Sequence, residues 1–277
     1  MGCTHWTLTI SKVLALATVT GCGTSNTAES DSTDSDAPTD TSSDTDEEPA
    51  PEPAAALHGR VTDPNGNPVG GAAVNFCKAI CQTATTDASG NYALTGLIPN
   101  QASFYVVPLA ESELLPLMNV LTLADGDDRT IDVKVYPASV ETPIPTIAGL
   151  VEVENGLQIG IGLDVLKPAP FTELGSYFFA TEIPSTDFPH LEVAEEPITM
   201  WVLAPFEAEA EAGMPVRVKN RFGLEAGAKA NLWAAGAPNA ATWLPVGELT
   251  VDGDGEWFSG ETSLPIVTTL LLSRSAE

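Results

Sequence analysis

The chain has 277 residues, of which 43% are hydrophobic, and it carries 38 Asp and Glu against 11 Lys and Arg, for a formal net charge of −27. So few cations argue against a nucleic-acid-binding protein, because phosphate binding depends on Lys and Arg. They also disfavour docking on anionic lipid headgroups, whereas the acidity itself aids solubility without indicating a partner.

A short apolar run near the N-terminus, residues 13–19, leads into Thr20-Gly21-Cys22. The run is at the lower end of the about 7–15 apolar residues of a secretory signal, and it is too short for a membrane span of about 20 residues. The stretch Val19-Thr20-Gly21-Cys22 resembles the lipobox of bacterial lipoproteins. The resemblance implies a signal peptide over residues 1–21, a lipid on Cys22 and anchoring to a membrane of the cell envelope. Gly23 after the cysteine favours the outer membrane; an ordinary cleaved signal followed by a free cysteine is the alternative.

An acidic segment rich in Ser, Thr and Pro, residues 22–56, comes next. It contains ten Asp and Glu, no Lys or Arg, and almost no large apolar residue. Such a segment buries too little apolar surface to offset the entropy of ordering, so we expect a disordered linker that holds the rest of the chain away from the membrane.

Residues 57–137 alternate short apolar runs with tight turns, as in an all-β domain. Strands are expected at 57–62, 72–76, 82–86, 91–94 and 104–107, with turns at Asp63-Pro64-Asn65-Gly66 and Asp87-Ala88-Ser89-Gly90. The stretch GRVTDPNGNPVGGAAVNF, followed by TTDASGNYALTGLIPN, resembles the carboxypeptidase regulatory-like domain. That resemblance implies a prealbumin-like β-sandwich with an accessory role and no peptidase activity.

Cys77 and Cys81 lie in this domain, four residues apart. In an oxidising compartment such a pair usually forms a disulfide, which here would close the end of a hairpin. Free thiols and a zinc site are the alternatives, although zinc needs further Cys or His ligands. His58 and His190 are the only histidines left after signal removal, and their spacing suggests no ligand set.

Residues 138–277 are expected to form a second β-sandwich, after a linker at residues 140–145. Strands are expected at 147–153, 157–163, 177–183, 198–203, 215–219, 230–233, 242–249, 255–258 and 267–272. Only residues 207–211 show a weak helical period. The stretches PVRVKNRFGLEAGAKANLW and TWLPVGELTVDGDGEWF are similar to the β-sandwich domain of zonula occludens proteins, netrin receptors and ankyrins.

No motif indicates an enzyme, a metal site or a cofactor. Asp252-Gly253-Asp254-Gly255-Glu256 resembles half of a calcium loop, but the remaining ligands of an EF-hand are absent, so a hairpin turn is expected. Residues 125–128 are likewise expected to form a turn. His190-Leu191-Glu192 matches the His-x-Glu pattern of zinc deaminases, but the accompanying Pro-Cys-x-x-Cys is missing. No Gly-x-Ser-x-Gly elbow and no phosphate-binding glycine loop occurs.

Four tryptophans fall on or beside expected strands: Trp201, Trp233, Trp243 and Trp257. Their apolar neighbours favour core packing, whereas exposed coplanar rings would favour stacking on sugars. The sequence therefore predicts an all-β chain, with two consecutive β-sandwiches after a signal peptide and an acidic linker. As a function it predicts a non-catalytic, lipid-anchored envelope protein with a structural or protein-binding role. A carbohydrate-binding surface lipoprotein is the alternative.

Overall fold

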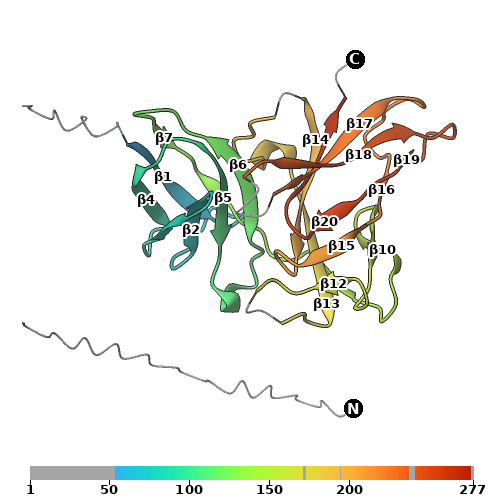
Figure 1. The fold of residues 1–277 in the computed structure, drawn as a ribbon, viewed down its shortest axis with the longest axis horizontal. Helices are drawn as coiled ribbons and strands as arrows, with labels where there is room; N and C mark the ends of the chain where they lie inside the picture. The colour runs from blue at the N-terminus through green and yellow to red at the C-terminus, as the bar shows by residue number, and fades with distance from the viewer. Residues whose placement is uncertain (1–53, 171–172, 194, 237–240, 276–277) are drawn as a thin grey trace, which may run out of the picture. The chain divides into compact units, whose positions relative to one another are not determined.

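The computed structural model describes residues 54–170, 173–193, 195–236 and 241–275, and its regular elements are β-strands and two short 3₁₀ turns (Figure 1). The expected all-β class, built from β-sandwiches, is confirmed. Cys22, the predicted signal peptide and nearly all of the predicted acidic linker lie outside the described residues. None of the helical turns in the described part has the length and apolar character to cross a bilayer.

The first β-sandwich consists of two sheets that enclose one core. One sheet has the order β4-β1-β7, with β8 also paired to β1, and the other has the order β3-β2-β5-β6. The strand β1 pairs antiparallel with β4 and parallel with β7 and β8. The elements are β1 Ala55–Thr62, β2 Ala73–Cys77, β3 Cys81–Thr85, β4 Asn91–Leu97, β5 Gln101–Val107, η1 Ala110–Ser112, β6 Leu117–Thr122, β7 Asp128–Thr130 and β8 Val133–Lys134.

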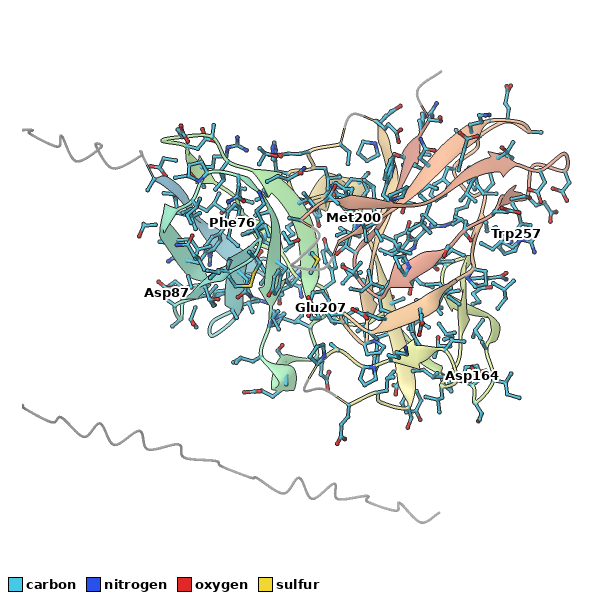
Figure 2. The ribbon with its side chains drawn as sticks, in the orientation of Figure 1. Phe76, Asp87, Asp164, Met200, Glu207 and Trp257 are labelled. Atoms are coloured by element: carbon cyan, nitrogen blue, oxygen red, sulfur yellow. A yellow bond between two sulfur atoms is a disulfide. The ribbon has the colours of Figure 1, made fainter. Side chains whose placement is uncertain are left out.

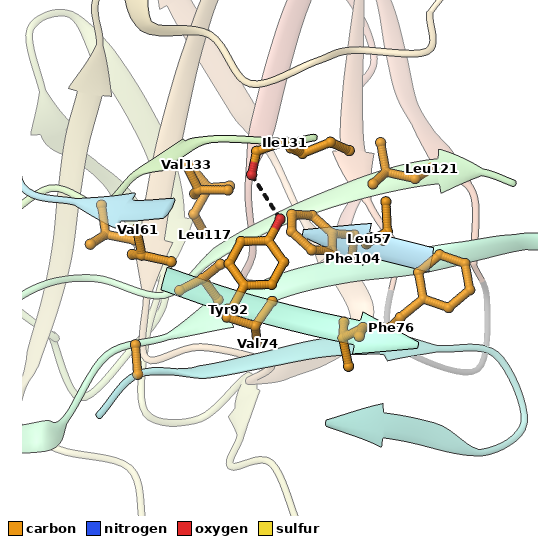
Figure 3. Packing of buried hydrophobic residues seen from close by; sticks show 14 of the residues in the cluster. Leu57, Val61, Val74, Phe76, Tyr92, Phe104, Leu117, Leu121, Ile131 and Val133 are labelled. Carbon is orange, nitrogen blue, oxygen red and sulfur yellow. Dashed lines mark hydrogen bonds between the residues drawn. The ribbon is translucent and has the colours of Figure 1, made fainter. Parts of the chain in front are cut away.

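The core between these sheets follows from the alternation of side chains along each strand. In β4, Tyr92, Leu94 and Leu97 are buried and most residues between them are exposed, which is the pattern of a strand with one face on a core. The Tyr92 hydroxyl donates a hydrogen bond of 2.7 Å to the carbonyl of Ile131 inside the core (Figure 3). Burial raises the pKa of this phenol, so the ring stays neutral.

Two turns of the first sandwich share the pattern Asp-x-x-Gly-Asn. In the first, Asp63 Oδ1 accepts the backbone N–H groups of Asn65 and Asn67 at 2.8 and 2.9 Å. Asp87 makes the same pair of bonds at the same spacing, and hydrogen bonds from the asparagine four residues on lower the pKa of both carboxyls. The glycine of the first turn, Gly66, has φ +83°, a conformation that glycine adopts without a steric penalty. The turns predicted from the sequence are confirmed.

The second region is built on a ten-stranded sheet with the order β10-β11-β16-β19-β18-β17-β21-β14-β13-β9 and a three-stranded sheet β12-β15-β20. Its core contains Trp201, Phe178, Phe258 and the aliphatic side chains around them. The elements are β9 Val140–Pro143, β10 Gly149–Glu154, β11 Leu157–Ile161, β12 Leu166–Lys167, β13 Tyr177–Ile183, η2 Ser185–Asp187, β14 Pro197–Ala204, β15 Glu209–Met214, β16 Val216–Lys219, β17 Lys229–Ala235, β18 Trp243–Val251, β19 Trp257–Ser259, β20 Leu264–Ile266 and β21 Leu270–Arg274.

One expectation for this region is wrong. Residues 140–143, expected in a linker, form the edge strand β9, which pairs antiparallel with β13 from Val140↔Ala180 to Pro143↔Tyr177. Proline is tolerated there because an edge strand leaves one row of N–H groups unpaired. The weak helical period at residues 207–211 falls largely in strand β15, where Ala210 and Met214 pack into the core.

The core of the first sandwich continues into the second region. Ile183, Met200, Val202 and Leu271 of the second region belong to the same cluster of buried apolar side chains as the strands β1 to β8 (Figure 2 labels Met200). In addition, the buried backbone N–H of Met118 in β6 donates to the Thr269 hydroxyl at 3.0 Å. The two regions are therefore joined by shared buried surface.

Candidate functional site

The candidate binding site is a recess of about 280 Å³ in which two tryptophans meet two acidic side chains. It draws on the start of β5, on Glu192, Val193 and Glu195 from the β13–β14 connection, on β17 and on the start of β18. Its volume lies just below the about 300–1,000 Å³ of pockets for drug-sized ligands, so it suits one sugar ring or one amino-acid side chain. The lining residues are Gln101, Glu192, Val193, Glu195, Trp233, Thr242 and Trp243.

A larger hollow, of about 830 Å³, lies beside β16 and β19 and is lined in part by Arg217, Glu261 and Phe258. Phe258 is the aromatic residue of this lining, and it is buried in the core of the second region. The smaller recess is the better candidate, because binding sites combine accessible aromatic surface with a few converging polar groups.

The first acidic side chain of the recess, Glu192, is paired with Arg129 of the first sandwich, a guanidinium that it shares with Asp127. Its Oε1 accepts a hydrogen bond from Arg129 Nη1 at 3.0 Å, which is also an ion pair. Its Oε2 accepts the backbone N–H of Thr122, at the end of β6, at 2.6 Å. Glu192 therefore positions the β13–β14 connection on the first sandwich.

Further contacts hold this connection along the first sandwich. Lys134 Nζ donates to Asp187 Oδ1 at 2.7 Å, and this bond lowers the pKa of the Asp187 carboxyl. The side-chain amide of Asn119, which is fully buried, donates to the carbonyl of His190. The recess is consequently formed by anchored chain segments before any ligand arrives.

The second acidic side chain, Glu195, differs in its partners. Its Oε1 accepts from the Asn231 amide at 2.7 Å. Its Oε2 accepts from Trp233 Nε1 at 3.2 Å and from the Ser273 hydroxyl. All three donors are uncharged, so the negative charge of Glu195 has no cationic partner within ion-pair distance among the described residues.

The two tryptophans of the recess are half-buried and differ in their N–H groups. Trp233 uses its indole N–H on Glu195 and on the Ser273 hydroxyl, the latter at 3.0 Å. The indole N–H of Trp243 is shielded and has no acceptor among the described residues. The indole N–H of Trp201 in the core of the second region is likewise shielded and without an acceptor among the described residues, so this feature does not distinguish the recess.

The other two tryptophans lie elsewhere. Trp201 is fully buried in the core of the second region, as the sequence predicts. Trp257, on β19 (Figure 2), is half-buried beneath the guanidinium of Arg217, which lies 4.4 Å from the ring centroid. Core packing alone thus describes Trp201, whereas Trp233, Trp243 and Trp257 keep part of their surface accessible.

His190-Leu191-Glu192 forms part of the β13–β14 connection. His190 contributes its backbone carbonyl and Glu192 its carboxylate to contacts with the first sandwich. Within the residues that the structure describes, no group of three or more His, Cys, Asp or Glu side chains could hold a metal ion.

The two acidic stretches expected to be turns do form turns. Between β18 and β19, the Gly255 N–H donates to the Asp252 carbonyl and the Asp252 N–H donates to the Trp257 carbonyl, both at 2.9 Å. Before β7, the Asp127 N–H donates to the Ala124 carbonyl at 3.1 Å.

Cys77 and Cys81 are joined in a disulfide, as predicted. The bond links the last residue of β2 to the first of β3, which are paired with each other. The Tyr105 hydroxyl lies 3.5 Å from Cys77 Sγ and 3.9 Å from Cys81 Sγ and is the only possible donor of these contacts. The alternatives of free thiols and a zinc site are therefore not realised.

Glu154, at the end of β10, is a buried acidic residue. It accepts hydrogen bonds from the Ser139 hydroxyl and from the Asn155 amide, and burial raises its pKa. Since β10 also lies against β9 and β13, this side chain closes the sheet where its two ends approach. With 4% of its surface exposed, Glu154 is inaccessible to a substrate.

For Trp233 and Trp243 the sequence favours core packing, with stacking on sugars as the alternative, and both do pack against the core while lining the recess; nothing in the sequence points to Gln101, Glu195 and Thr242. No local pattern connects these residues, because strands far apart in the chain bring them together. Cys22, the predicted lipidation site, lies outside the described residues.

Comparison with a family model identifies part of the chain. Residues 56–136 match the carboxypeptidase regulatory-like domain. The match falls on the first sandwich and agrees with the resemblance seen in the sequence. No curated protein matches the chain. The similarity of residues 138–277 to the domain of zonula occludens proteins, netrin receptors and ankyrins stays a prediction.

Solved structures give only weak likenesses. A proposed carbohydrate-binding protein from Bacteroides uniformis is 13% identical, with 80% of each chain covered and a TM-score of 0.25. A DUF3823 family protein from Parabacteroides merdae is 11% identical, with 78% of this chain and 98% of that chain covered and a TM-score of 0.26. A streptococcal ancillary pilin is 10% identical, with 82% and 60% covered and a TM-score of 0.26. Likenesses at this level carry no argument about function.

Proposed function

We propose that this chain is an exported lipoprotein that presents its β-sandwiches at the cell envelope to bind another envelope component, without catalysing a reaction. The observation that carries the export is the Cys77–Cys81 disulfide. Disulfides persist in oxidising compartments outside the cytoplasm and are rare inside it. The lipobox-like stretch Val19-Thr20-Gly21-Cys22 supports the same conclusion from the other end of the chain.

Anchoring follows from the residues before the first sandwich. A lipid on Cys22 would attach the chain to a membrane, and multiple acyl chains on one cysteine anchor stably where a single chain does not. The acidic linker then supplies a spacer of like charges that repel one another. Gly23 supports the outer membrane as the site of attachment.

The binding role rests on the joined architecture and on the recess. Contacts with the first sandwich hold the described part of the β13–β14 connection beside the recess, and the lining of the recess combines indole rings, carboxylates and neutral polar groups. A preformed concave site is the usual form of a binding pocket.

Two cysteine variants test the anchoring. Cells producing the chain are labelled with radioactive palmitate and separated into membrane and soluble fractions. Cys22→Ser is expected to abolish both the label and the membrane association. The matched variant Cys3→Ser, which changes a cysteine within the predicted signal peptide, is expected to retain both. Label that persists in Cys22→Ser would contradict the proposal.

Glycan binding is a second candidate function, and the half-buried state of Trp233 and Trp243 favours it, because indole faces stack on sugar rings. A glycan array probed with the full chain tests it. Binding of envelope glycans that is lost in Trp243→Phe but kept in Trp257→Phe would make this candidate the function of the recess.

A further inference from the structure

The recess carries a specific charge asymmetry. Glu192 is paired with Arg129, whereas Glu195 is surrounded by the uncharged donors Asn231, Trp233 and Ser273. Hydrogen bonds from neutral groups fix the orientation of a carboxylate but leave its full negative charge in place. The carboxylate of Glu195 therefore lies at a defined position in the recess without a cationic partner among the described residues.

Two indole rings line the same small space as this charge. Tryptophan is the aromatic side chain that attracts cations most strongly, through the negative face of its ring. Since Trp233 already donates its N–H to Glu195, the carboxylate and at least one ring belong to a single fixed arrangement. Indole rings beside a carboxylate form a suitable environment for an organic cation.

Trp243 adds ring surface to this environment. Its indole nitrogen is shielded by the protein, so a ligand meets the accessible part of the ring and not the N–H. A recess of about 280 Å³ admits a single long side chain. A lysine or arginine therefore offers an apolar stem for the rings and a cation for Glu195.

We infer that the recess binds the cationic side chain of a Lys or Arg in a basic segment of an envelope protein. The inference rests on the proposed function as a binding module and names its ligand class. A neutral glycan carries no charge that could pair with the Glu195 carboxylate, so this carboxylate favours a basic segment over a neutral glycan as the ligand.

The test measures binding of short blocked peptides to the full chain by NMR titration. The probe is Ala-Gly-Lys-Gly-Ala, and the matched neutral probe has Gln in place of Lys. We expect the lysine peptide to bind at least about tenfold more tightly than the glutamine peptide, a difference of about 1.4 kcal/mol. Added salt should weaken binding of the lysine peptide and leave binding of the glutamine peptide unchanged.

Variants locate the binding. Glu195→Gln should lower the affinity for the lysine peptide by about tenfold or more. Glu196→Gln removes a charge that is exposed and paired with Arg274, and it should change this affinity by less than about twofold. Trp243→Phe should weaken binding, and Trp257→Phe should not. If Glu195→Gln fails to fold, Trp243→Phe and the salt dependence still decide the matter.

Three outcomes would overturn the inference. They are equal binding of the two peptides, binding by neither, and preferential binding of the neutral trisaccharide maltotriose. None of them bears on anchoring through Cys22, which the palmitate label tests separately, so failure of the ligand class and failure of the envelope location remain distinguishable.

Discussion

The first sandwich and the second region are both antiparallel β-structures for the most part, and both join strands that are remote in sequence, such as β1 with β7 in the first, but only the first contains the two Asp-x-x-Gly-Asn turns. In the first sandwich, Asp63 and Asp87 fix turns through bonds to residues two and four positions on. In the second region, the central sheet joins strands that are remote in sequence, such as β11 with β16 and β14 with β21. The comparison shows that turn chemistry specifies local structure, whereas distant pairing depends on the whole fold.

The largest expected effect concerns the core that joins the two regions. Met200 is fully buried in the shared cluster, so Met200→Ala should lower the free energy of unfolding by about 2–5 kcal/mol. If the regions unfold together, tryptophan fluorescence, which reports on the second region, and hydrogen exchange of β1 and β4 should give the same loss of unfolding free energy. Leu249→Ala, in the core of the second region alone, serves as the comparison.

Independent unfolding would appear as unchanged exchange of β1 and β4 in Met200→Ala. That result would mean that the shared surface does not couple the first sandwich to the second region.

A second variant tests the close packing of the first sandwich. A Cβ atom added at Gly59 would lie 2.1 Å from the Ile131 carbonyl oxygen, so Gly59→Ala must push β1 away from its neighbour. We expect a loss of about 1–3 kcal/mol or more in unfolding free energy, measured by urea denaturation. Gly149→Ala in β10 meets no atom within 4 Å and should be nearly neutral. Equal effects of the two substitutions would contradict the close approach at Gly59.

The disulfide is expected to contribute less. It closes a five-residue loop between paired strands, for which loop-closure scaling gives about 2 kcal/mol. The double variant Cys77→Ser, Cys81→Ser should lose about this much, and reductant should lower the wild-type midpoint to the same value without affecting the variant. A wild-type midpoint that does not respond to full reduction would show that the bond contributes nothing to stability.

The smallest effect is a contrast in pH dependence. Asp63 in the first sandwich has a lowered pKa, owing first to its hydrogen bond with the Asn67 side chain. Its contribution to stability is therefore present above the ordinary pKa of 3.8 and is lost as the pH falls further. Glu207 in the second region has a pKa raised by burial and then by Glu209, so its contribution is lost as the pH rises through 4.5 and above.

Opposite substitution effects should follow from this contrast. Glu207→Gln should raise the unfolding free energy at pH 7 by up to about 1 kcal/mol and change it little at pH 4. Asp63→Asn should lower it slightly at pH 7 and not at pH 3. Urea midpoints between pH 3 and pH 7 measure both, and a shift of the same sign for the two variants would contradict the assigned pKa directions.

How much the sequence predicts follows the same division between local and distant contacts. The turns at Asp63 and Asp87, the strand Tyr177–Ile183 and the disulfide are predicted because neighbouring residues decide them. The residues of the edge strand β9 were expected to form a linker, because a proline such as Pro143 usually interrupts a strand. Pro143 is tolerated here because β9 lies at the edge of the sheet.

The recess is predicted only in part. Its tryptophans stand out as a residue type, but the distinction between Glu192 and Glu195 depends on Arg129 reaching one carboxylate and not the other. Arg129 lies 63 residues from Glu192 in the chain, and no pattern in the sequence connects them. The charge state of the site is thus a property of the fold.

The binding role of the recess is tested most directly by the indole N–H signals of the tryptophans, recorded by NMR while the lysine peptide is added to the full chain. The signals of Trp233 and Trp243 should shift in a saturable way, and those of Trp201 and Trp257 should stay in place. Saturable shifts of the Trp257 signal alone, or no shift of any indole signal, would contradict a ligand site in the recess.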